Sequence, residues 1–128
     1  MIPNVGEVDN LTKSTAEELT LKLASNDPAS SEALTVASFT EVAGGGYASK
    51  SLPTSERTIV AGDPSTCTYP VKNFTFTGAT NAPGVVYWYY IVNGAGVLKG
   101  CERFPSGVLP YTPVAGAQIN ITPTLKHS

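Results

Sequence analysis

The chain has 128 residues, of which 41% are apolar and only 14% are charged, and its net charge is −2. This length predicts one domain that buries a core without a metal or a disulfide framework. The eight basic residues are scattered and form no basic stripe, so direct nucleic-acid binding is not expected. The apolar runs are too short to span a membrane, and no secretory signal follows Met1, which predicts a protein made in a cytoplasm.

The low charge content has two explanations. Charged residues normally make up about a quarter of a globular chain. Either other protein subunits cover much of the surface, or Ser, Thr and Asn solvate it, as they do in many β proteins. The composition alone supports both explanations equally.

The N-terminal stretch, residues 1–14, mixes apolar and charged side chains. Val5, Val8 and Leu11 recur at helical spacing. This stretch is therefore predicted to be a short helix or an ordered arm. The remainder, residues 15–128, is predicted to be a single β domain.

The first predicted strand runs from Leu19 to Leu23. Leucine alternates there with Thr and Lys, the pattern of a half-buried strand, so Leu21 is a predicted core residue. A second strand is predicted from Ser38 to Val42. The three glycines at 44–46 then indicate a tight bend or a close approach of two backbone segments, with an extended segment following up to Leu52.

The second half of the chain has the clearer β pattern. Residues 66–70 form a short extended segment, and residues 72–77 alternate Phe with hydroxyl side chains, so Phe74 and Phe76 are predicted core residues. The run 85–92 is the most β-prone and predicts a central strand. An Asn-Gly turn at 93–94 then leads to a returning strand that passes through Cys101 and Arg103.

The central strand carries four consecutive aromatic residues. Alternation places Tyr87 and Tyr89 on one face, which is predicted to be the core face, and Trp88 and Tyr90 on the other. The second face then needs a cover. A second layer of the chain, a neighbouring subunit or a carbohydrate could each provide it.

The last predicted strand covers residues 118–123, with Ile119 and Ile121 as core residues and Leu125 extending the same face. The chain thus contains about seven or eight short strands, with turn residues about every ten positions. This spacing predicts an all-β fold, an antiparallel β-sandwich or jelly roll.

No group of residues predicts catalysis, so the chain is not expected to be an enzyme. His127 is the single histidine, which leaves no Ser-His-Asp or Cys-His arrangement. Cys67 and Cys101 lack the spacing of a zinc or redox motif and are predicted to be free thiols. No cofactor and no metal is predicted. The neighbours Glu102 and Arg103 are interpreted as a charge set at a sheet edge or an interface.

Several segments resemble small structural proteins of tailed bacteriophage particles. The resemblance covers most of the chain through short motifs, and it departs from the family pattern at Cys101, where a small residue is usual, and at Thr58-Ile59, where a Trp is often found. The motifs are Pro-Asn-Val-Gly-Glu (3–7), Gly-Gly-Gly-Tyr-Ala (44–48), Phe-Thr-Phe-Thr-Gly (74–78), the Tyr-rich run 87–92, Cys-Glu-Arg-Phe (101–104) and Gly-Ala-Gln-Ile-Asn-Ile-Thr-Pro (116–123).

The resemblance implies a virion protein, made in the host bacterial cytoplasm, that acts as a capsid decoration or cement protein. It would bridge subunits of the major capsid protein and form a homo-oligomer, most simply a trimer. A tail, baseplate, head–tail or fibre-attachment component is the alternative, and a carbohydrate-binding module is an alternative of another class.

The contacts in such a particle are predicted to come from the N-terminal arm and the Pro-rich loop 104–114, because both are irregular and apolar. The predicted interface residues are Ile2, Pro3, Val5, Val8, Phe104, Pro105, Pro110 and Tyr111.

Overall fold

A computed structural model describes residues 17–29, 33–61, 65–104 and 111–127. Within these ranges it contains nine strands, all paired antiparallel, and two short 3-10 helices, Val36–Ser38 and Thr54–Glu56. The predicted all-β, antiparallel fold is confirmed, with nine strands where about seven or eight were expected. The more specific description as a sandwich or jelly roll stays a prediction.

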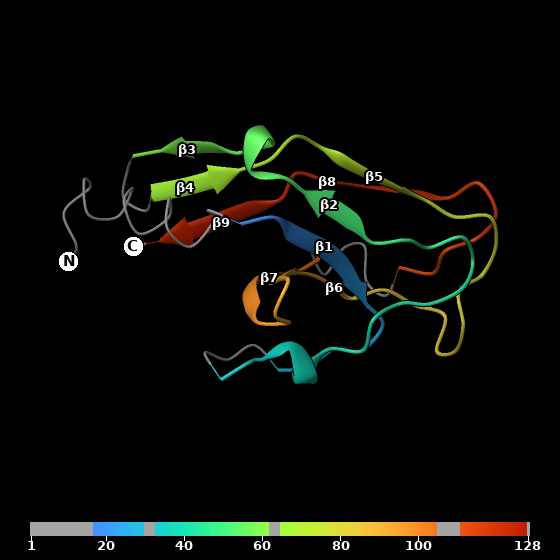
Figure 1. Ribbon diagram of the computed structural model, residues 1–128. Coiled ribbons are helices and arrows are strands. Elements are labelled where there is room, and N and C mark those ends of the chain that lie inside the picture. Colours follow the sequence, from blue (N-terminus) through green and yellow to red (C-terminus); the bar gives the residue numbers. More distant parts are fainter. Residues whose placement is uncertain (1–16, 30–32, 62–64, 105–110, 128) are drawn as a thin grey trace.

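The strands form three sheets (Figure 1). The largest has four strands in the order β2 (Lys50–Leu52), β1 (Leu19–Ala24), β6 (Trp88–Asn93) and β7 (Leu98–Arg103). The second contains β3 (Thr58–Val60), β4 (Ser65–Thr68) and β9 (Thr124–His127), and the third contains β5 (Lys72–Thr75) and β8 (Gln118–Ile121).

The two smaller sheets are parts of one interrupted ladder. In Figure 1, β4 leads into β5, and β8 leads back into β9 alongside them. Pro70 and Pro123 stand at the junction, and proline cannot donate a ladder hydrogen bond. Three residues (69–71) separate β4 from β5 but only two (122–123) separate β8 from β9, so one strand bulges there.

One hydrophobic core joins the four-stranded sheet to this ladder. It combines the leucines of β1, Tyr89 and Ile91 of β6, and apolar side chains of β4, β5, β8 and β9. Six of the predicted core residues are buried in it: Leu21, Phe74, Phe76, Tyr89, Ile119 and Ile121.

Tyr87 is an exception, and its assignment to the core face was wrong. It is half-buried and packs against the opposite cluster, with Trp88 and Tyr90. Regular pairing of β6 begins only at Trp88, and Tyr87 instead donates its N–H to the Ala24 carbonyl at 3.0 Å. Alternation therefore does not extend to this residue.

The second aromatic face is covered by the same chain. Phe39 stacks on Tyr90 with ring centroids 4.8 Å apart, and its edge meets Trp88 at 5.5 Å. Leu34 and Val36 pack beside it. The predicted strand from Ser38 to Val42 is therefore wrong: this segment is an irregular cover that keeps only one bridge to β1, between Ala24 and Glu41.

Among the described residues, no helix has the length and apolar character needed to cross a membrane.

Candidate interaction surface

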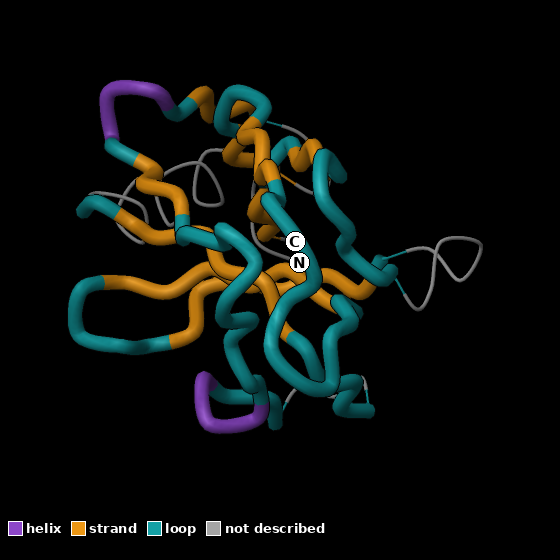
Figure 2. Tube along the Cα trace, turned by 90° about the vertical axis from the view of Figure 1, so that its right-hand side faces the viewer, coloured by secondary structure: helices purple, strands orange, loops and turns teal. Residues whose placement is uncertain are grey.

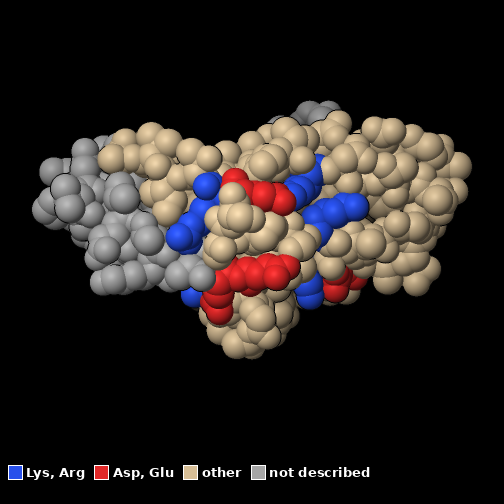
Figure 3. Space-filling view, turned by 45° about the horizontal axis from the view of Figure 1, so that its top comes forward, with Lys and Arg blue, Asp and Glu red and all other residues tan. Residues whose placement is uncertain are grey.

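Charged residues are unevenly distributed along the chain and over the structure. The two longest runs without any are residues 73–98 and 104–125, and residues 42–49 are one of several shorter runs. Figure 3 shows the Lys, Arg, Asp and Glu side chains of one face gathered over its middle, while the right-hand end is free of them. The loops at that end, residues 42–49, 76–87 and 111–117, contain no charged residue. We call this part of the molecule the uncharged end.

Backbone hydrogen bonds tie the loops of the uncharged end together. The N–H groups of Thr77 and Asn81 donate to the carbonyls of Gly45 and Ala43 at 2.8 and 2.7 Å. The N–H of Gly116 donates to the Phe76 carbonyl at 2.9 Å. Figure 2 looks onto this end and shows loops in front of the strands. The surface is thus a fixed arrangement of loops from three distant parts of the sequence.

The three glycines at 44–46 allow two of these loops to approach each other. All three have positive φ angles, which L side chains rarely adopt. A Cβ on Gly45 would also lie 2.7 Å from the Gly78 carbonyl oxygen. The predicted close backbone approach at this site is confirmed.

The exposed side chains of the uncharged end are small, polar without charge, or aliphatic. Thr77, Ala79, Asn81 and Ala115 are exposed, and Val114 is 59% exposed. Removing such groups from water costs much less than removing ammonium or carboxylate groups. This surface is therefore suited to contact with another protein through shape and neutral hydrogen bonds.

The outer face of β5 and β8 continues this neutral chemistry with a ladder of amides. Asn73 and Asn120 lie directly opposite each other, and the Asn73 Nδ2 group donates to the Asn120 Oδ1 atom at 2.7 Å and to the Gln118 Oε1 atom at 3.1 Å. The Thr75 hydroxyl donates to the Asn73 Oδ1 atom at 2.6 Å. These cross-strand contacts hold the exposed polar groups in place.

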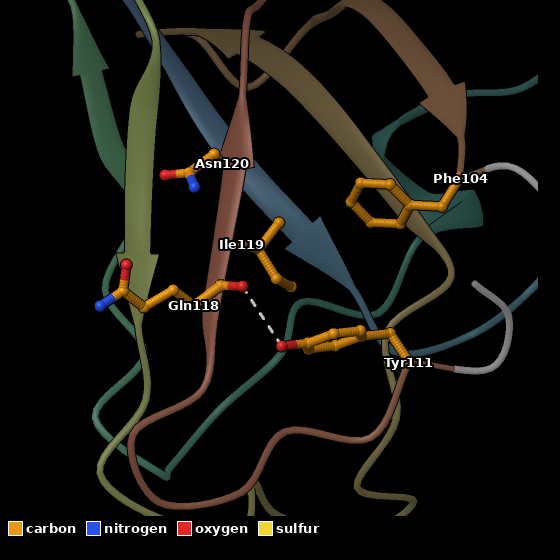
Figure 4. Close-up of a pocket in the computed structure, with 5 residues that line it drawn as sticks. All are labelled: Phe104, Tyr111, Gln118, Ile119 and Asn120. Carbon is orange, nitrogen blue, oxygen red and sulfur yellow. Dashed lines mark hydrogen bonds between the residues drawn. The ribbon is translucent and has the colours of Figure 1, made fainter.

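A hollow of about 180 Å³ lies on the other side of β8 (Figure 4). The rings of Phe104 and Tyr111 flank it, and Ile119 points toward them, whereas the side chains of Gln118 and Asn120 point away. The Tyr111 hydroxyl donates to the Gln118 carbonyl at 3.3 Å. The structure thus brings together two of the predicted interface residues, Phe104 and Tyr111, both half-buried. The other predicted interface residues, Ile2, Pro3, Val5, Val8, Pro105 and Pro110, lie outside the described residues.

The charged middle contains ion pairs that hold elements together. Asp27 accepts two hydrogen bonds from Arg103 at 2.8 Å and one from the Trp88 indole at 2.9 Å. The hydrogen bond from Arg103 lowers the pKa of Asp27. Lys72 pairs with Glu56 at 2.6 Å. Arg103 and its neighbour Glu102 have different partners: Arg103 binds Asp27, and Glu102 accepts a hydrogen bond from Tyr89 at 2.8 Å.

The described residues contain no cluster of metal-binding side chains. No three of their His, Cys, Asp and Glu side chains gather where a metal ion could bind. Cys67 and Cys101 are free thiols. Burial raises the pKa of Cys101, so it is a poor nucleophile at neutral pH.

No protein-family model, curated protein or solved structure matches this chain. The proposed function therefore rests on the physical features of the surface and on the sequence motifs. Sequence reasoning missed the uncharged end as a unit, although part of its signal, the two long runs 73–98 and 104–125 without charge, is visible in the sequence. Only the folded chain brings loops of these runs together with residues 42–49.

Proposed function

We propose that this chain is a non-enzymatic structural protein of a bacteriophage particle, a capsid decoration or cement protein that bridges subunits of the major capsid protein. The observation that carries the proposal is the uncharged end, where Val114 and small polar side chains are exposed without any charged neighbour in the three loops. A protein that stays alone in water usually covers such a region with Lys, Glu, Arg or Asp. The resemblance of the sequence motifs to phage virion proteins supplies the kind of assembly.

The proposed mechanism is the repetition of many modest contacts. A neutral surface loses less hydration than a charged one when it meets another protein. Copies that bind at equivalent positions of a shell, most simply as homotrimers, would each hold neighbouring capsid subunits together, and linked contacts add in free energy. The shell would then resist the pressure of the packaged DNA.

The copy number of the protein in purified particles tests this proposal. Quantitative mass spectrometry is expected to find about one copy per major capsid subunit, because decoration repeats over the whole lattice. A number far below this would favour the alternative, a tail, baseplate, head–tail or fibre-attachment component. Complete absence from the particle would overturn the virion proposal.

Carbohydrate binding through the central aromatic strand finds no support in the structure. The glycan-stacking surface would need the rings of Trp88 and Tyr90 in contact with solvent. Both residues are only 3% exposed beneath Phe39.

A further inference from the structure

The turn between β6 and β7 contains the only Asn-Gly pair of the sequence, Asn93 and Gly94. The Asn93 carbonyl accepts a hydrogen bond from the Gly96 N–H at 3.0 Å, and the Asn93 N–H donates to the Val97 carbonyl at 3.1 Å. Gly96 has a φ angle of 80°, which glycine adopts more readily than other residues. A tight turn that ends in a glycine bulge therefore fixes the backbone around this pair.

The side chain of Asn93 is held in the turn by its amide oxygen. The Oδ1 atom accepts hydrogen bonds from the backbone N–H groups of Ala95 and Val97 at 3.0 and 2.9 Å. Two donors that converge on one carbonyl oxygen polarise its carbon and stabilise negative charge that develops on the oxygen. The Cγ atom of Asn93 is therefore activated toward a nucleophile in the folded chain.

Gly94 places a nucleophile next to this carbon, because attack of its backbone nitrogen on Cγ closes a five-membered ring. Gly94 is exposed, and its N–H has no hydrogen-bond acceptor among the described residues. A Cβ at this position would meet nothing within 4 Å, so no neighbouring side chain shields the nitrogen from solvent. An attack within one chain also needs no encounter of two molecules, which raises its rate.

We propose that Asn93 is a site of spontaneous deamidation and that the turn directs the product to aspartate. The Gly94 nitrogen loses its proton to solvent and bonds to Cγ of Asn93, and the Cγ–Nδ2 bond breaks as ammonia leaves with a proton from solvent. The resulting succinimide takes up one water molecule. Attack of this water on Cγ gives aspartate in a normal backbone, whereas attack on the backbone carbonyl carbon of residue 93 gives isoaspartate.

The two N–H donors of the turn favour the first product. They point at the oxygen on Cγ, so they activate this carbon toward water as well as toward Gly94. Isoaspartate would lengthen the backbone by one methylene group and disturb the hydrogen bonds of Asn93 with Gly96 and Val97. Aspartate retains an oxygen for both donors and binds them more strongly, because its carboxylate is charged.

Deamidation would also change the charge of this part of the surface. The turn residues 94–97 are uncharged, and an apolar hollow of about 560 Å³ adjoins them, with walls from Leu34, Val36, Val97 and Leu98. The product adds one negative charge to a chain whose net charge is −2. Ion-exchange chromatography therefore separates the modified chain from the unmodified one.

The test incubates the full-length chain at mildly alkaline pH, once folded and once unfolded in urea. Peptide mapping by mass spectrometry assigns the modified residue and distinguishes aspartate from isoaspartate. In the folded chain, Asn93 is expected to react ahead of the other asparagines, none of which precedes a glycine, and aspartate is expected to exceed isoaspartate several-fold. In urea the turn is lost, so the excess of aspartate is expected to disappear.

Asn93→Asp makes the expected product directly and tests how the turn receives it. Because its carboxylate accepts both N–H groups, this variant is expected to need at least as much urea for unfolding as the wild type. Asn93→Ala, which has no acceptor, is the matched control and is expected to unfold at lower urea.

Three results would overturn the inference. In the first, Asn93 stays intact in the folded chain while it reacts in urea. In the second, isoaspartate exceeds aspartate in the folded chain, so the N–H donors do not direct the water. In the third, Asn93→Asp unfolds as early as Asn93→Ala. None of these measurements involves a particle, so the inference is independent of the proposed function.

Discussion

Asp27 connects the turn after β1 to two other strands. Its carboxylate accepts two hydrogen bonds from Arg103 at the end of β7 and one from Trp88 at the start of β6. The Arg103 guanidinium matches the two carboxylate oxygens, which is the strongest geometry for such a pair. Asp27 thereby ties the turn after β1 to the start of β6 and the end of β7.

The contribution of Asp27 to stability is expected to depend on pH. Because its pKa in the folded chain lies below the ordinary value of 3.8, the ionised form stabilises the fold above that pH, and the stabilisation is lost as the pH falls through the folded-state pKa. Asp27→Asn keeps an acceptor for Trp88 but has no carboxylate to protonate. Between about pH 6 and pH 3, the wild type is therefore expected to lose more unfolding free energy than the variant, by up to about 1 kcal/mol because the pair is partly exposed.

Urea unfolding at a series of pH values measures this difference. Glu17→Gln, which removes an exposed carboxylate elsewhere in the chain, is the control and should follow the wild type. Parallel stability curves for wild type and Asp27→Asn would show that the pair with Arg103 contributes nothing.

The glycine loop at 44–46 permits a prediction at the scale of an element. Gly45 and Gly96 both have positive φ angles, of 62° and 80°, but a Cβ on Gly45 would meet two backbone carbonyls whereas one on Gly96 would meet nothing. Alanine at either position is expected to lower the free energy of unfolding by about 1 kcal/mol, because its backbone must adopt a left-handed conformation. Gly45→Ala is expected to cost at least about 2 kcal/mol more, because backbone cannot yield as a flexible side chain does.

Chemical denaturation of the two variants separates the backbone cost from the steric cost. The loss of unfolding free energy in Gly96→Ala gives the backbone cost. The additional loss in Gly45→Ala gives the steric cost. Equal losses would show that the loops 42–49 and 76–87 are not held as close together as the structure has them.

Sequence periodicity predicted those strands that bury one face. β1, β5 and β8 alternate apolar and polar residues because one side of each lies on the core, and their buried residues follow from that alternation. β3 was missed, because only Ile59 of its three residues is even half-buried. The segment from Ser38 to Val42 looked like a strand, but its apolar residues serve to cover Trp88 and Tyr90 instead.

The candidate surface could be predicted only in part. Phe104 and Tyr111 were predicted to be interface residues because the loop that contains them is irregular and apolar. In the structure both residues line the same hollow. Their position against β8 depends on a pairing between distant segments, which local patterns do not contain. The same is true of the uncharged end, whose loops are joined by hydrogen bonds between residues tens of positions apart.

At the scale of the whole molecule, the distribution of charged side chains distinguishes the charged middle of the surface from the uncharged end. The middle carries ion pairs such as Lys72–Glu56 and Lys22–Glu41, with separations of 2.6 and 3.6 Å, which belong to a surface in water. The uncharged end lacks such pairs because its sequence runs contain no charged residue. If that end is covered in an assembly, a single new charge there must be buried or must prevent the contact.

Val114→Lys tests this expectation, because Val114 is exposed in the uncharged end and its replacement disturbs no core contact. An unpaired ammonium group in an interface costs several kcal/mol, about enough to abolish a contact of modest affinity. Ser55→Lys, at another exposed position, next to Glu56 and Arg57, adds the same charge where charges already occur. Both variants are expected to unfold with the wild type, within about 0.5 kcal/mol, as surface substitutions do. Only Val114→Lys should fail to bind particles that lack the protein, measured by co-sedimentation. Binding by Val114→Lys at the wild-type level would mean that water, rather than protein, covers the uncharged end, and its Thr and Asn side chains would then be sufficient to solvate it.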